Sequence, residues 1–109
     1  MYIHPQTGAN WDTKTVDSGV VTDSAIWTPD NNKKIIITDI IISVSSATTV
    51  TLYFNSDTTD NRIFKGYFAA NQGVHIAFSG LRISPVNGVI KVTNTAATAS
   101  IEVTGVEVS

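Results

Sequence analysis

The sequence contains no cysteine, only two histidines and only two glutamates among its 109 residues. The missing thiols exclude a disulfide framework, a thiolate metal site and a cysteine nucleophile. They leave the redox compartment open, because a cysteine-free chain is stable in either environment. Charged residues are also few, at 15%, and the formal net charge is −2.

The few basic residues do not form a cluster, since the only adjacent pair is Lys33 and Lys34. A duplex-binding surface needs a concentrated basic face, so we expect no nucleic-acid partner. The longest hydrophobic runs are three isoleucines at 35–37 and three at 40–42, far short of the roughly 20 residues of a membrane helix. The first five residues lack a basic and apolar signal peptide, which predicts synthesis in the cytoplasm without membrane attachment.

The composition is instead dominated by residues that branch at Cβ: 12 Val, 13 Ile and 15 Thr, against two Leu. Branched side chains suit the pleated surface of a strand better than a helix. The sequence therefore predicts an all-β protein, and its length allows one domain. Polar side chains are mostly Ser, Thr and Asn, 33 in all, and such uncharged polar surfaces are common in proteins that assemble.

Alternating hydrophobic patterns between turn-forming residues define the expected strands. We expect an antiparallel, jelly-roll-like β-sandwich of about eight strands over residues 16–109, preceded by an N-terminal arm at 1–15. The expected strands are 20–27, 33–45, 48–55, 62–68, 74–78, a short piece at 81–83, 89–93 and 99–109. In the last of these, the hydrophobic alternation changes phase, which predicts a β-bulge at Thr104 and Gly105.

The strand at 33–45 is hydrophobic on both faces. Strict alternation places Ile36, Ile40, Ile42 and Val44 on one face, and Ile35, Ile37 and Ile41 with Asp39 on the other. Two apolar faces predict a central strand, or one whose outer face another subunit or the arm covers. The arm itself carries hydrophobic residues that a free tail would lack. The expected subunit or capsid contacts are therefore Tyr2, Ile3, Pro5, Trp11, Ile35, Ile37, Asp39 and Ile41.

The sequence predicts no enzyme and no cofactor. His75 is out of phase with Val74 and Ile76 and should point away from the core, and no nucleophile or zinc motif accompanies it. Asp39 lacks a paired carboxylate of the kind that acid–base catalysis uses, so an ion pair or a subunit contact is the expectation. A small hydrolase using Asp39 or His75 is the enzyme alternative.

The sequence also offers candidate residues for a calcium site and for a sugar-binding site. Loops at 57–61 and 30–32 carry Asp and Asn oxygens that could bind Ca²⁺, but such loops also arise from turn geometry, and we expect no metal. The aromatic residues Trp27, Tyr53 and Tyr67 could form a platform for sugar stacking, which is a second alternative.

From Lys33 onward, the order of elements resembles small virion proteins of tailed bacteriophages. The segments that carry the resemblance are Lys-Ile-Ile-Ile-Thr-Asp-Ile-Ile-Ile-Ser, Thr-Val-Thr-Leu-Tyr-Phe, Ile-Phe-Lys-Gly-Tyr-Phe-Ala-Ala-Asn-Gln-Gly, Asn-Gly-Val-Ile-Lys-Val-Thr and Val-Thr-Gly-Val-Glu-Val. They are similar to capsid decoration (cement) proteins or fibre-associated β-sandwich modules. No functional residue is fixed by these segments.

The resemblance implies a virion structural protein that binds the major capsid protein and stabilises the head lattice, commonly as a homotrimer. The alternative is a carbohydrate-binding or receptor-binding module of a tail fibre, because the same fold serves many functions.

Overall fold

The structure is a computed structural model, and it describes residues 10–96 and 98–109. Eight strands account for most of this chain, with one short 3-10 helix between the fourth and fifth. The elements are β1 (Asn10–Ser18), β2 (Val21–Trp27), β3 (Lys34–Val44), β4 (Thr48–Phe54), η1 (Thr59–Asn61), β5 (Arg62–Phe68), β6 (Gly73–Ile83), β7 (Ile90–Asn94) and β8 (Ala99–Val108).

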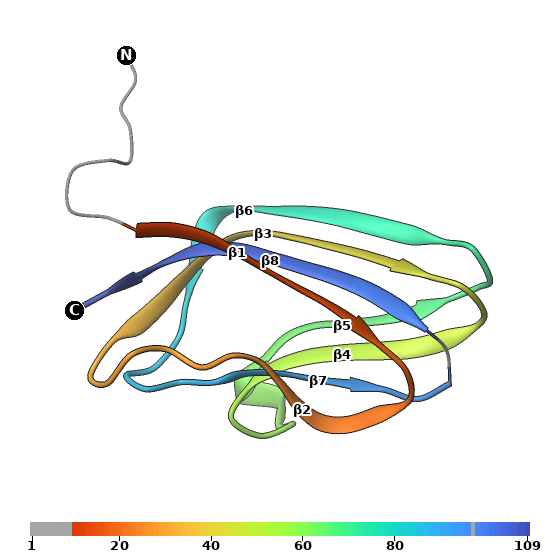
Figure 1. Ribbon diagram of the computed structural model, residues 1–109, viewed down its shortest axis with the longest axis horizontal. Coiled ribbons are helices and arrows are strands. Elements are labelled where there is room, and N and C mark those ends of the chain that lie inside the picture. The colour runs from red at the N-terminus through yellow and green to blue at the C-terminus, as the bar shows by residue number, and fades with distance from the viewer. Residues whose placement is uncertain (1–9, 97) are drawn as a thin grey trace, which may run out of the picture.

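The strands form two four-stranded antiparallel sheets packed face to face (Figure 1). Sheet A has the order β1-β8-β3-β6, and sheet B has the order β2-β7-β4-β5. The chain thus crosses repeatedly between the sheets, which is the connectivity of a jelly roll. The predicted all-β sandwich is confirmed.

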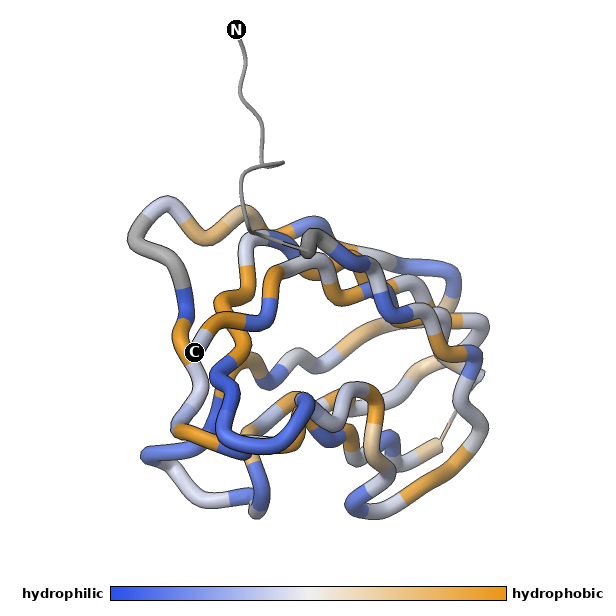
Figure 2. Tube along the Cα trace, turned by 60° about the vertical axis from the view of Figure 1, so that its left-hand side comes forward, coloured by the Kyte–Doolittle hydropathy of each residue, from blue (hydrophilic) through white to orange (hydrophobic). Residues whose placement is uncertain are grey.

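The hydrophobic core lies between the sheets, where alternate residues of both inner faces meet. Hydrophobic and hydrophilic residues accordingly intersperse along the strands of the trace (Figure 2). On β4 the alternating hydrophobic residues Val50, Leu52 and Phe54 point inward as expected, but Thr51 and Tyr53 between them are buried as well. The central strands supply the other fully buried side chains, including Ile40, Ile42, Ile90, Val92, Ile101 and Val103.

The sandwich begins earlier than the sequence predicts. Strand β1 pairs with β8 along its whole length, so residues 10–15, assigned to the arm, belong to sheet A. The sequence of β1 shows no alternation of hydrophobic and polar residues, because the charged Asp12 and Lys14 lie on the same side of the strand as Val16. Backbone pairing at a sheet edge does not require a hydrophobic pattern. The remainder of the expected arm, with Tyr2, Ile3 and Pro5, lies outside the described residues.

The predicted β-bulge is on the wrong strand. Strand β8 pairs with β1 without interruption, whereas the β3–β8 register shifts between Ile37 and Asp39. Thr38 is therefore the extra residue, and strict alternation along β3 fails at this point. The shift turns Ile37 and Ile40 to the same inner side, and both are fully buried. Two expected pieces, at 74–78 and 81–83, form one strand, β6.

Tight turns between strands are made by Asx residues. Among the described residues, every non-glycine residue with positive φ is Asn or Asp: Asn32, Asn55, Asn71 and Asn87 in the connections between strands, and Asp23 at a register shift within β2. These residues tolerate the left-handed region better than other L residues. The abundance of Asn in the sequence thus reflects turn geometry.

Candidate functional site

The outer face of sheet A brings together three of the residues that the sequence singled out, Asp39, Ile41 and His75. Asp39 lies opposite Ala77, and Ile41 lies opposite His75, across the β3–β6 ladder. The His75 Nε2 atom is 3.0 Å from the Asp39 Oδ1 atom. We call Asp39, Ile41, His75 and Ala77 the outer-face patch.

The side chains of the outer-face patch are accessible. The His75 side chain is 59% exposed, the Asp39 side chain is 37% exposed and Ile41 is 42% exposed. His75 therefore points away from the core, as predicted, and Asp39 pairs with histidine instead of Lys or Arg. A polar contact this exposed contributes little to stability.

Two predicted contact residues are wrong. Ile35 and Ile37 are fully buried within the chain, because the bulge at Thr38 makes the first half of β3 face inward at odd-numbered positions. Ile41, in the second half, faces outward. The backbone of Trp11 lies in β1 opposite Val106, and its side chain is outside the description.

The prediction that three aromatic residues form an exposed sugar platform is also wrong. Trp27 is 2% exposed and Tyr53 is fully buried, so neither ring is accessible for stacking. Only Tyr67 is open to solvent, at 76% exposure. Its ring lies 5.6 Å from the Lys65 ammonium, measured to the ring centroid.

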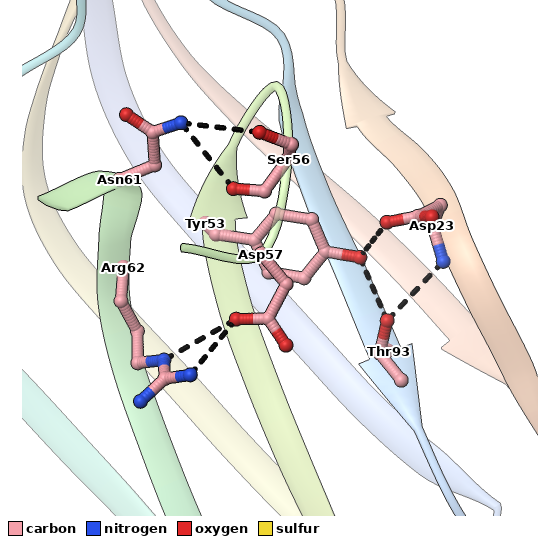
Figure 3. Close-up of polar contacts among 7 residues, drawn as sticks. All are labelled: Asp23, Tyr53, Ser56, Asp57, Asn61, Arg62 and Thr93. Atoms are coloured by element: carbon pink, nitrogen blue, oxygen red, sulfur yellow. Dashed lines mark hydrogen bonds and ion pairs between the residues drawn. The ribbon is translucent and has the colours of Figure 1, made fainter. Parts of the chain in front are cut away.

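Tyr53 instead connects three strands of sheet B (Figure 3). Its hydroxyl donates to the Asp23 carboxylate on β2 and lies 2.7 Å from the Thr93 Oγ1 atom on β7. The Asp23 N–H donates to the same Thr93 oxygen at 3.2 Å. Burial, followed by the Asp23 carboxylate, raises the pKa of Tyr53. The cluster is a structural link between β2, β7 and β4.

The Asx loop at 57–61 uses its polar groups internally. The Asp57 carboxylate forms an ion pair with Arg62 at 3.1 Å, and the Asn61 Nδ2 atom donates to Ser56 (Figure 3). In the described part of the chain, no group of three or more His, Cys, Asp or Glu side chains is arranged to hold a metal ion.

Glu107 organises one end of the sandwich, which the sequence did not reveal. Its carboxylate accepts the Trp27 Nε1–H at 2.8 Å and the Asp30 N–H at 2.9 Å. The Lys14 ammonium lies 5.5 Å from the centroid of the Trp27 ring and forms an ion pair with Asp12. The hydrogen bond from Trp27 is the main reason that the pKa of Glu107 is lowered. No local pattern could reveal this contact, because 80 residues separate its partners.

Glu107 makes stability dependent on pH in a predictable direction. A carboxyl group whose pKa is lower in the folded protein contributes stability above its unfolded pKa, and this contribution is lost as the pH falls through the folded pKa. We expect Glu107→Gln to unfold at lower temperature than wild type at neutral pH. The difference should shrink below the ordinary glutamate value of 4.5. Thermal unfolding across the acid range measures this, and a constant difference at every pH would contradict it.

Comparison with known proteins adds no family: no family model matches this chain, and no curated protein matches it. Within the described residues, no helix has the length and the apolar character needed to cross a membrane.

Proposed function

We propose that this protein is a structural protein of a bacteriophage virion that binds the capsid lattice as a decoration protein. The observation that carries the proposal is the outer face of sheet A, where Ile41 is 42% exposed. Its direct neighbours across the sheet are His75 on β6 and Glu102 on β8, and Asp39 and Ser43 flank it along β3. Toward the β1 edge, Thr13 pairs with Thr104 on the same face. Strands β1, β8, β3 and β6 all contribute to the surface.

The chemistry of this face suits protein–protein contact. Neutral hydroxyls cost less to desolvate than ions, and an exposed isoleucine gains free energy when it is covered. The charged residues next to Ile41 are acidic, Asp39 along β3 and Glu102 across from it on β8. We therefore infer a capsid contact that is neutral or basic. Such a protein stabilises a shell by adding buried surface between subunits, and this role needs a rigid body instead of a catalytic group.

The carbohydrate-binding alternative has less support. Two of the three aromatic rings of the expected platform are buried, and only Tyr67 is accessible. Stacking by one ring on a sheet surface gives no shaped sugar site.

The proposal is tested by adding purified protein to capsids of the phage that encodes it and measuring the bound fraction by co-sedimentation. Wild type should bind. Ile41→Asp should weaken binding by about tenfold or more, because it places a charge at the centre of the contact. Val20→Asp is the matched control: Val20 is 67% exposed and lies in the turn between β1 and β2. Absence of wild-type binding would refute the capsid role. Full binding by Ile41→Asp would show that the capsid contact does not include the surface around Ile41.

A further inference from the structure

Strand β6 is the least protected of the four sheet edges. The other three edges carry charged residues: Asp12, Lys14 and Asp17 on β1, Arg62 and Lys65 on β5, and Asp23 on β2. Strand β2 is also irregular, with two register shifts. Charges and irregularities are the usual means of preventing sheets from joining edge to edge. Strand β6 has neither between Gly73 and Ala77. Its register with β3 shifts only after Ala77, since Asp39 pairs with Ala77 and Ile37 with Arg82, and its one charged residue, Arg82, stands near its end.

Arg82 is also directed away from the free edge. Its Nη2 atom donates to the Arg62 carbonyl at 2.9 Å, and its guanidinium carbon lies 5.7 Å from the centroid of the Phe54 ring. Both partners belong to sheet B, because Phe54 ends β4 and Arg62 begins β5. The guanidinium therefore closes the space between the sheets and does not shield the β6 backbone.

The backbone groups of β6 that face the free edge can be identified. The Val44 N–H donates to the Gln72 carbonyl at 2.9 Å, one step beyond the pair Ser43 and Gly73. In an antiparallel ladder the bonded pairs alternate. Even-numbered residues of β6 therefore direct their N–H and C=O groups toward β3, and odd-numbered Gly73, His75 and Ala77 direct theirs outward.

The inner side of this edge is apolar. Val74, Ile76 and Phe78 pack against the core but are only partly buried. Across the open side of the sandwich, Phe64 and Phe68 of β5 are partly buried in the same way. Partial burial leaves apolar surface at the flank that a further strand would cover.

We propose that β6 pairs with β6 of a second copy of this chain, antiparallel, about a twofold axis at Ile76. The pairing joins two copies of sheet A into one eight-stranded sheet. This inference is independent of the proposed capsid role. It also differs from the homotrimer that the sequence resemblance implies, because edge pairing of identical strands produces a twofold dimer.

The edge chemistry selects this axis. The outward-facing groups must bond odd-numbered residues to odd-numbered residues, and an axis at Ile76 pairs His75 with Ala77 of the second copy. On the inner side it places Val74 opposite Phe78, so a large ring meets a smaller side chain. An axis at His75 would instead place the two imidazoles directly opposite each other, which is unfavourable when they are charged. The β6 edge is thus complementary to itself.

Disulfide formation between two copies tests which residues of β6 lie opposite each other. With the axis at Ile76, the two copies of this residue form a non-hydrogen-bonded pair, whose Cα atoms lie about 4.5 Å apart, within the range that a disulfide spans. Ile76→Cys should therefore form a covalent dimer under mild oxidation, and the chain has no other thiol to interfere. Val74→Cys is the matched control and should cross-link at least about tenfold more slowly, because its partner is Phe78. Equal rates for both variants would refute the register.

A proline at Ala77 tests the proposed backbone pairing at the β6 edge. The Ala77 N–H faces outward, so Ala77→Pro leaves the bonds to β3 intact and removes two bonds across the twofold. We expect the dimer to dissociate about 100-fold more readily, while Ala77→Thr, which keeps the N–H, should dimerise like wild type. Sedimentation equilibrium of the full chain measures both. A monomeric or trimeric wild type, or an Ala77→Pro dimer as tight as wild type, would overturn the proposal. If Ala77→Pro does not fold, Ala77→Lys provides the same comparison through charge repulsion at the edge.

Discussion

Gly105→Ala is expected to be the most damaging single-methyl change in this protein. A Cβ atom at Gly105 would lie 2.2 Å from the Ile36 carbonyl oxygen and 3.2 Å from the Ile37 Cα atom. Both obstacles are backbone of the neighbouring central strand, so they cannot rotate away as a side chain could. We expect the free energy of unfolding to fall by about 3 kcal/mol or more, measured by chemical denaturation.

The chain offers a matched control at Gly19. No atom lies within 4 Å of a Cβ built there, so Gly19→Ala should change the free energy of unfolding by no more than about 0.5 kcal/mol. If Gly105→Ala were as stable as wild type, the close contact between β8 and β3 would be refuted.

The second large effect is a difference between two isoleucines of one strand. Strict alternation would give Ile37 and Ile41 the same environment, but the extra residue at Thr38 separates them. Ile37 is fully buried, whereas Ile41 is 42% exposed on the outer face. Ile37→Ala should therefore cost about 2–5 kcal/mol of unfolding free energy, from lost burial and the cavity it leaves.

Ile41→Ala should cost less than about 1 kcal/mol, since its methyl groups are already partly in water. Denaturant unfolding of the two variants under identical conditions provides the comparison. Similar losses would mean that β3 alternates without a bulge. A larger loss for Ile41 would mean that the two faces of β3 are reversed.

Much of the architecture follows from local chemistry. The excess of Val, Ile and Thr restricts the chain to strands, and Asn and Asp at the turns place most boundaries within a residue or two of those observed. Alternation on β4 correctly selected the inward-facing residues Val50, Leu52 and Phe54. These features depend on near neighbours in the chain, which a sequence displays directly.

Other features depend on partners far apart in the sequence. Strand β1 is held by backbone pairing with β8, and such pairing leaves no hydrophobic pattern to read. The burial of Tyr53 and Trp27 depends on Asp23 and Glu107, which come from other strands. Of the predicted contact residues whose side chains the structure describes, only Asp39 and Ile41 are placed together on an accessible surface.

The sequence by itself determined the all-β class, the approximate number of strands and the presence of an irregularity near Gly105. Only the tertiary structure decided which strand carries the extra residue, because a phase change in one strand and a bulge in its neighbour give similar patterns. A bulge is a relation between two strands, and this one lies at Thr38, between the pairs Ile37–Gly105 and Asp39–Thr104. The extra residue also decides that Ile37 is buried and that Ile41 is exposed.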